Sequence, residues 1–98
     1  MKIKFNKNNG IMSVSLEGRL DTTTAPVLDK TVWEDLGDTK NLILDIKGLE
    51  YISSAGLRVL LAAQKRMKKV GSMKVINVCE EVMEVFEMTG FADILTIN

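Results

Sequence analysis

The sequence predicts an α/β fold in which helices pack on a mixed β-sheet. Two alternating segments flank Asn9-Gly10, a pair typical of a tight antiparallel hairpin, and helix-like and strand-like segments then take turns along the chain. The chain has 98 residues, of which 46% are hydrophobic, enough to bury one core. We therefore expect a single α/β domain over residues 1–98, with a mixed sheet of four to five strands.

The first part of the chain carries the hairpin and one helix. Residues 2–6 and 12–16 alternate apolar and polar side chains, so the hairpin should have one wet face, and the alternation ends at Gly18-Arg19. A helix begins near Pro26, whose missing N–H costs nothing in a first turn, and Gly37 closes it. The apolar positions expected on the inner faces are Ile3, Phe5, Met12, Val14, Leu16, Ala25, Leu28, Val32 and Leu36.

The rest of the chain alternates strands and helices. The apolar run 41–46 predicts a central strand covered on both faces, and glycines end the helices that follow. In order, we expect a loop over 47–53, a helix over 54–70, a strand over 73–78, a helix over 80–89 and a short strand over 94–97; the helix positions expected inside are Leu57, Leu60, Leu61, Met67, Val82, Val85 and Phe86.

Composition excludes most catalytic and metal chemistry. The chain has no histidine and one cysteine, so neither a Ser-His-Asp triad nor a zinc site of thiolates and imidazoles can be built. We expect no enzyme activity, no metal and no cofactor. A rival hypothesis, a lone acid/base among Asp21, Asp45 and Glu50, lacks a paired carboxylate, and Asp45 is expected at a strand end. Cys79 fits a buried thiol in a reducing compartment.

Charge and hydropathy bear on location and partners. No segment has the apolar block of a signal peptide or the roughly 18 apolar residues of a membrane span, so we expect a cytoplasmic protein that does not insert into membranes. The net charge is zero, which argues against nucleic-acid binding. Basic residues nevertheless concentrate in 57–75 and acidic residues in 76–98. Either adjacent helices complement each other, or a basic face beside an acidic one docks a partner with patterned charge.

Three further groups of side chains have a structural and a functional interpretation. Trp33 is expected as a half-buried packing residue, or as the anchor of a contact with a partner. The six methionines are expected mainly in the core. An acidic cluster near the C-terminus fits a solvated helix face better than a cation site, since no calcium-loop motif is present; it comprises Glu80, Glu81, Glu84 and Glu87.

The most informative stretch is Tyr51-Ile52-Ser53-Ser54-Ala55-Gly56-Leu57, which leads into an expected helix. A serine at a helix start is commonly a cap. Gly in a first turn costs up to about 1 kcal/mol relative to Ala, but small residues there let another backbone or a phosphate approach the free N–H groups. Upstream, Asp21 is either a helix cap or an acid that contacts a partner. Thr22, Thr23 and Thr24 are interpreted as caps rather than phosphoacceptors.

These residues, with Leu44-Asp45-Ile46 before them and Gly18-Arg19-Leu20-Asp21 upstream, closely resemble the STAS domains. That family includes anti-sigma factor antagonists and domains of sulphate transporters. The resemblance covers essentially the whole chain in length, element order and motifs. It implies a single STAS-type domain over residues 1–98.

The resemblance also implies the function of a bacterial anti-sigma factor antagonist. In this family the unmodified protein binds an anti-sigma factor that is also a serine kinase, and a sigma factor is freed for transcription. The kinase then phosphorylates a serine at the start of the second helix, which releases the antagonist, and a serine phosphatase resets it. The modified serine matches Ser54. The partner-binding residues so implied are Asp21, Thr22, Thr23, Ser53, Ser54, Ala55, Gly56 and Arg58.

The sequence departs from the family motif at two positions. The motif usually reads Asp-Ser-(Ser/Thr)-Gly-Leu, whereas Ser53 stands here in place of the aspartate and Ala55 in place of the second hydroxyl residue. Ser53 is therefore a second candidate for phosphorylation. The missing aspartate also keeps open an alternative function, as an interaction subunit of a membrane lipid- or solute-transport complex, which STAS-like domains also serve.

Overall fold

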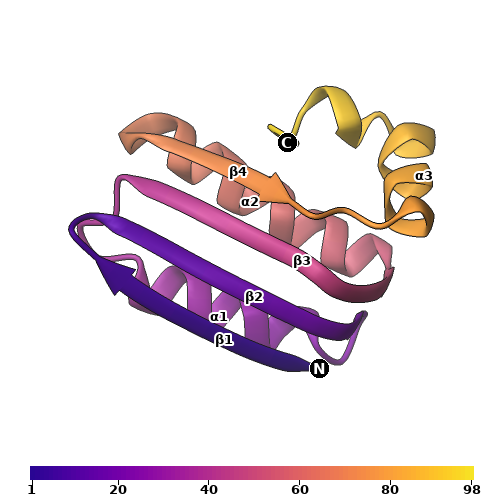
Figure 1. Ribbon diagram of the computed structural model, residues 1–98, viewed down its shortest axis with the longest axis horizontal. Coiled ribbons are helices and arrows are strands. Elements are labelled where there is room, and N and C mark those ends of the chain that lie inside the picture. Colours follow the sequence, from indigo (N-terminus) through magenta and orange to yellow (C-terminus); the bar gives the residue numbers. More distant parts are fainter.

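The computed structural model describes the backbone of residues 1–98 and all side chains except those of Val32 and Trp33, so the predictions for these two side chains lie outside the described residues. A four-stranded sheet has the order β1-β2-β3-β4 (Figure 1). The elements are β1 (Lys2–Asn8), β2 (Ile11–Leu20), α1 (Ala25–Asp35), β3 (Asn41–Ile52), α2 (Ser54–Val70), β4 (Ser72–Ile76), α3 (Glu80–Thr89) and the short 3-10 helix η1 (Phe91–Asp93).

The opening hairpin is confirmed. β1 and β2 pair antiparallel, and Asn9 and Gly10 both have positive φ, 51° and 79°, as the tightest hairpin turns require. The β2–β3 and β3–β4 pairs are parallel, so the sheet is mixed as predicted. A parallel pair needs a crossover connection, and α1 and α2 provide the two crossovers.

Strand β3 is longer than the sequence suggested, and the predicted loop over 47–53 is wrong. Residues up to Ile52 pair with β2, including Glu17 with Gly48 and Leu20 with Ile52. Two register shifts accommodate the extra length, and at each of them β3 carries the additional residue, between Asp45 and Gly48 and between Leu49 and Tyr51. A Cβ on Gly48 would lie only 2.6 Å from Cγ of Glu17, so glycine allows the two strands to approach here. Asp45 is consequently inside a strand and not at its end.

The two crossover helices α1 and α2 lie on the same side of the sheet (Figure 1). The expectation that the run 41–46 is covered on both faces is therefore wrong. Leu42, Leu44 and Ile46 are buried, whereas Ile43 and Asp45 between them are partly exposed. A continuous apolar run does not by itself distinguish a strand covered on both faces from one that alternates.

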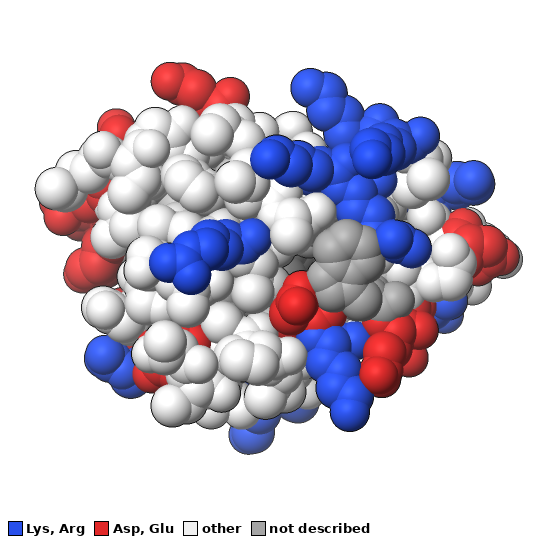
Figure 2. Space-filling view, turned by 180° about the vertical axis from the view of Figure 1, so that it is seen from behind, with Lys and Arg blue, Asp and Glu red and all other residues white. Residues whose placement is uncertain are grey.

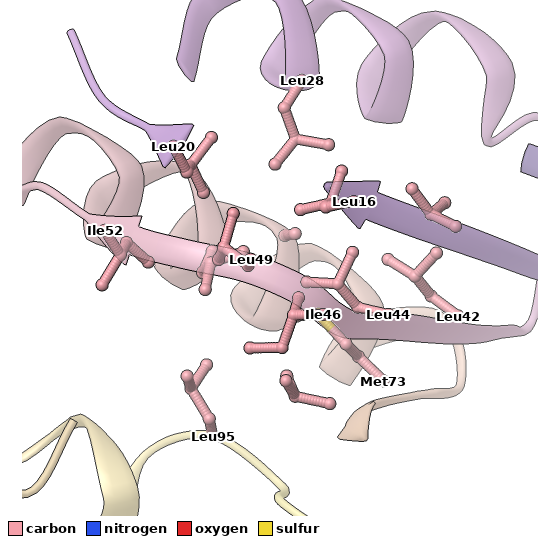
Figure 3. Packing of buried hydrophobic residues seen from close by; sticks show 14 of the residues in the cluster. Leu16, Leu20, Leu28, Leu42, Leu44, Ile46, Leu49, Ile52, Met73 and Leu95 are labelled. Carbon is pink, nitrogen blue, oxygen red and sulfur yellow. The ribbon is translucent and has the colours of Figure 1, made fainter. Parts of the chain in front are cut away.

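The core fills the space between the helices and the face of the sheet that carries Leu42, Leu44 and Ile46 (Figure 3). Met12, Val14 and Leu16 of β2 meet Leu28 of α1 and Leu60 of α2 in one cluster. Several sequence-predicted core positions are less buried than expected. Phe5 on the edge strand is 46% exposed, and Ile3, Leu61, Val85 and Cys79 are partly exposed.

The C-terminal end departs from the sequence prediction. After α3 the chain forms η1 and then only an isolated parallel bridge, Val75 with Ile97, in place of the expected strand over 94–97. β4 likewise ends at Ile76 and not at residue 78, since Asn77 takes a positive φ of 58°. Among the described residues, no helix is both long and apolar enough to cross a membrane.

Candidate functional site

The candidate site lies where β2 and β3 end and α2 begins. The backbone N–H of Ser53 donates to the Leu20 carbonyl at 2.9 Å, which ties the start of α2 to the end of β2. Gly56 is buried against the same residue: a Cβ there would lie 2.8 Å from Leu20 Cγ and 3.0 Å from the Leu20 carbonyl oxygen. The small residue thus permits close approach of another backbone, one of the two roles that the sequence suggested.

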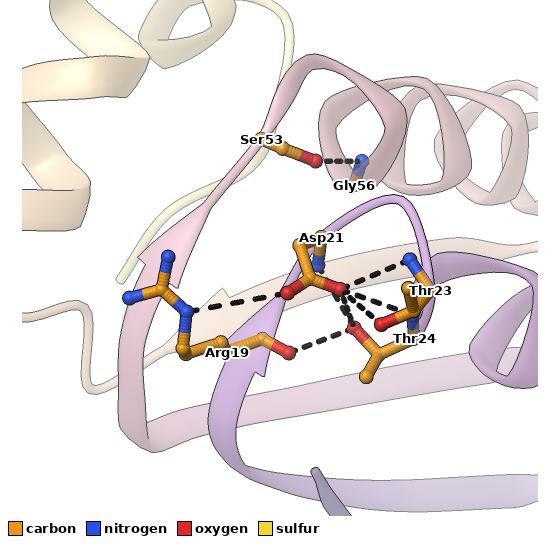
Figure 4. Close-up of polar contacts among 6 residues, drawn as sticks. All are labelled: Arg19, Asp21, Thr23, Thr24, Ser53 and Gly56. Carbon is orange, nitrogen blue, oxygen red and sulfur yellow. Dashed lines mark hydrogen bonds and ion pairs between the residues drawn. The ribbon is translucent and has the colours of Figure 1, made fainter.

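The two neighbouring serines have different environments. Ser53 is the N-cap of α2, with extended backbone, and its Oγ accepts a hydrogen bond from the Gly56 N–H at 3.3 Å (Figure 4). Ser54 is the first residue of the helix and is exposed. Its hydroxyl makes no hydrogen bond to any part of the chain that the structure describes. Helix capping is therefore assigned to Ser53, and the Ser54 hydroxyl is accessible.

Asp21 organises the turn before α1. Its Oδ1 accepts hydrogen bonds from the Thr23 hydroxyl at 2.8 Å, the Thr23 N–H at 3.0 Å and the Thr24 N–H at 3.2 Å (Figure 4). These bonds, led by that of the Thr23 hydroxyl, lower the pKa of the Asp21 carboxyl below its ordinary 3.8, against a smaller opposing effect of desolvation. Asp21 therefore stabilises the turn before α1 and does not cap the helix itself, and its side chain keeps 29% of its surface exposed.

The threonines after Asp21 serve the same turn. The Thr24 hydroxyl donates to the Arg19 carbonyl at 2.7 Å and accepts from the Asp21 N–H at 2.8 Å. Thr24 is the N-cap residue of α1 by position, yet its side chain makes no capping bond to the helix. Thr22 is exposed beside this network. The interpretation of these threonines as helix caps is therefore not confirmed: the Thr23 and Thr24 hydroxyls bind within the turn before α1.

Sequence reasoning missed a stacked pair next to this turn. The Arg19 guanidinium lies 4.2 Å from the centroid of the Tyr51 ring, and Arg19 Nε lies 4.0 Å from Asp21 Oδ2. Arg19 and Tyr51 are cross-strand partners in the β2–β3 pairing. Only the register of that long parallel pair brings them together, and the sequence had suggested a loop there. Tyr51 is 41% exposed, so the pair adds an aromatic surface to the site.

Two other predicted residues lie along α2. Ala55 is partly buried against the core, and Arg58 is exposed four residues after Ser54. Residues four apart lie on the same face of a helix. Arg58 is therefore the cation nearest in sequence to Ser54 on that face.

The remaining acidic candidates lie away from this turn. The Asp45 carboxylate accepts hydrogen bonds from the Lys47 N–H at 3.0 Å and the Asn77 side-chain amide at 3.1 Å, and Glu50 is exposed on β3. In the part of the chain that the structure describes, no group of three or more acidic or cysteine side chains is arranged to hold a metal ion. The geometry brings together Asp21 with its threonines, Arg19, Tyr51 and the start of α2.

These features define a class of protein: a small α/β domain that presents an accessible serine at the start of its second helix, beside a hydrogen-bonded acidic turn. The family model of the STAS domain matches residues 2–98, and the chain belongs to the STAS domain family. The fold class and the family resemblance are thereby confirmed.

Relatives of similar length support this assignment. BtrV of Bordetella bronchiseptica, provisionally named an anti-sigma factor antagonist, is 34% identical over 99% of this chain and 85% of its own length. The anti-sigma-B factor antagonist of Bacillus subtilis is 32% identical over 98% of this chain and 87% of its own length.

Solved structures show the same fold. An anti-sigma factor antagonist from Mycobacterium paratuberculosis superposes with a TM-score of 0.87 over 98% of this chain and 83% of its own, at 23% identity. The Bacillus cell fate determinant SpoIIAA in its phosphorylated form superposes with a TM-score of 0.74 over 99% of this chain and 91% of its own, at 16% identity.

Proposed function

We propose that this protein is an anti-sigma factor antagonist whose binding is switched off by phosphorylation of Ser54. The unmodified protein binds an anti-sigma factor that is also a serine kinase, and a serine phosphatase restores the unmodified form. The relatives named as antagonists cover nearly the whole chain and support the antagonist function. The observation that carries the choice of residue is the exposed Ser54 hydroxyl, free of hydrogen bonds to the described residues.

Ser53 is the less suitable acceptor because its oxygen is already used. Its Oγ caps the Gly56 N–H, and the residue is only partly exposed. A kinase acting on Ser53 would first have to break the cap, which contributes about 1 kcal/mol in typical helices. Ser54 needs no such opening.

A phosphate on Ser54 is compatible with the fold. It adds about −1.5 to −2 charges at the positive end of the α2 dipole, where anions are favoured. Arg58, on the same face one turn later, can pair with it. Phosphorylation should therefore leave the domain folded, so loss of binding comes from the contact with the partner, where added charge meets a surface shaped for a neutral hydroxyl.

The proposed contact surface surrounds Ser54. It combines the exposed Thr22 and Thr23, the partly exposed Asp21, and Arg58 on α2. Ser53 and Ala55 lie partly exposed beside them, while the buried Gly56 acts through packing. The Arg19–Tyr51 pair extends the surface with an aromatic ring, a side chain enriched in protein interfaces.

The test is a pull-down from native lysate with wild-type, Ser54→Ala and Ser54→Asp baits. We expect wild-type and Ser54→Ala baits to recover a serine-kinase anti-sigma factor and the Ser54→Asp bait to lose it, with thermal stability within about 1 kcal/mol of wild type. The matched control is Ser13→Asp, which adds the same charge at an exposed position on β2.

Other outcomes would overturn the proposal. Recovery of a transporter ATPase by every bait would favour the transport-complex function. That alternative is open because Ser53 replaces the aspartate of the family motif. Equal loss with Ser13→Asp would show that added charge alone disrupts binding. A large fall in stability with unchanged binding would assign Ser54 a structural role.

A further inference from the structure

The charges of this neutral protein are divided along one edge of the molecule. We call this surface the β4 edge: the C-terminal half of α2, β4, α3 and residues 94–98. Seen from behind, basic side chains gather at the upper right and acidic side chains lie at the upper left, while further acidic side chains lie at the right edge and below the basic group (Figure 2). Within the β4 edge, the basic residues come from 57–75 and the acidic residues from 76–98.

The basic end contains a groove of about 710 Å³ between α2 and the C-terminal segment. Lys65 and Lys68 of α2 and Lys74 of β4 line it, and apolar side chains including Ile94 complete its wall. Gln64 also lines the groove, and its buried Oε1 accepts no hydrogen bond from the described residues. The groove therefore offers a cationic rim and an apolar wall to a partner.

The acidic end is the outer face of α3. Val82 and Phe86 are buried, and Glu80, Glu84 and Glu87 recur at the spacing that places them together on the opposite, exposed face. Met88 follows Glu84 on this face and is 87% exposed. The outer face of α3 therefore combines an apolar side chain with carboxylates, whereas the groove combines apolar side chains with lysines.

The two ends do not neutralise each other within one molecule. Among the described residues, neither the three groove lysines nor the α3 glutamates form an ion pair. The interpretation that adjacent helices complement each other therefore fails for these groups. Their charges remain available to another molecule.

We propose that the β4 edge is a self-association surface, on which a second copy of this chain binds in reverse orientation. A two-fold axis across the edge places the basic groove of each copy against the acidic α3 face of the other. Such a contact is self-complementary, as two-fold dimers require, and the dimer contains the attraction between groove and α3 face two times. Ile94 and Met88 supply apolar contacts between the charged regions.

The size of the edge limits the strength of the dimer. The molecule extends 33 × 26 × 19 Å, so an edge along its longest and shortest axes covers about 600 Å². Stable interfaces bury about 800 Å² per partner. The dimer should therefore be weak and in exchange with monomer, and it should dissociate further as salt screens its charges. The basic groove lies along the C-terminal half of α2, whereas Ser54 begins that helix.

The test is sedimentation equilibrium of the full chain at low and high salt, with two charge-reversal variants. For wild type at low salt, we expect the apparent mass to rise with concentration from 10.9 kDa toward twice that value. Lys68→Glu/Lys74→Glu and Glu84→Lys/Glu87→Lys should each weaken self-association by at least about tenfold, because every contact becomes repulsive. Mixed together, the two variants should form a heterodimer, because both contacts are again between opposite charges.

The matched control reverses charges at the opposite edge of the sheet, Lys2→Glu/Lys4→Glu in β1, and should associate like wild type. Circular dichroism verifies that each variant is folded. A wild-type protein that stays monomeric at low salt and millimolar concentration would overturn the proposal. So would a dimer that survives both reversals, or variants that fail to form a heterodimer when mixed.

Discussion

At the scale of single residues, the site separates two hydroxyl groups that look equivalent in the sequence. Ser53 and Ser54 are adjacent, yet one caps α2 and the other is exposed without a hydrogen-bond partner among the described residues. The difference arises because the N-cap has extended backbone, which turns its side chain back toward the free N–H groups of the first turn. A structural role and a regulatory role can thus lie on neighbouring residues.

Replacing each serine with alanine should distinguish these roles. Ser53→Ala should lower the free energy of unfolding by about 1 kcal/mol, because the Gly56 N–H loses its acceptor, whereas Ser54→Ala should change it by less than about 0.5 kcal/mol. Urea denaturation of both variants measures the difference. Equal effects of the two substitutions would contradict the assignment of the cap.

The Asp21 turn should show a defined pH dependence. Folding lowers the pKa of the Asp21 carboxyl. The charged carboxylate therefore stabilises the fold at pH values above the pKa that Asp21 has in the unfolded chain. This contribution is lost as the pH falls through the lower pKa that Asp21 has in the folded protein. Asp21→Asn should therefore be less stable than wild type at neutral pH, and the gap should close below pH 3.8. Thermal unfolding of both proteins across this range measures it; a gap independent of pH would indicate that the charge is not responsible.

At the scale of secondary-structure elements, the start of α2 depends on how closely it approaches β2. Gly56 is buried against Leu20, whose carbonyl also accepts the Ser53 N–H. The helix is thereby fixed to the strand that leads into the Asp21 turn. This packing explains why a residue with poor helix propensity occupies the first turn.

Gly56→Ala tests this packing. Alanine is favoured over glycine in helices by up to about 1 kcal/mol, but the added Cβ would meet Leu20 and Ile52 at less than 3 Å. We expect net destabilisation of about 1 to 3 kcal/mol from overpacking. Chemical denaturation, with Ser54→Ala in the same turn as control, gives the value. A more stable Gly56→Ala protein would show that the close approach is not required.

At the scale of the whole molecule, one core joins all the elements. Phe86 of α3 is fully buried and belongs to the same cluster as Leu16 of β2 and Leu60 of α2. Helix α3 is therefore part of the cooperative unit, although it lies at the end of the sheet. Its outer face carries the charges assigned above to self-association.

Truncation of α3 side chains should reveal this cooperativity. Phe86→Ala should cost about 3 to 5 kcal/mol, whereas Met88→Ala on the exposed face should cost less than about 0.5 kcal/mol. If α3 unfolds with the rest of the domain, the denaturant slope of Phe86→Ala equals that of wild type. Global unfolding followed by fluorescence and circular dichroism tests both points, and a separate transition for α3 would contradict them.

The sequence by itself determined the element order, the hairpin turn at Asn9-Gly10, the buried faces of β2 and α2 and the serine-bearing helix start. These depend on turn chemistry and periodicity, which are local properties. Only the tertiary structure decided that residues 47–52 continue β3, that the helices leave one face of the sheet open, and that Arg19 stacks on Tyr51. Each of these depends on pairing with residues distant in the sequence, and local spacing carries no information about that register.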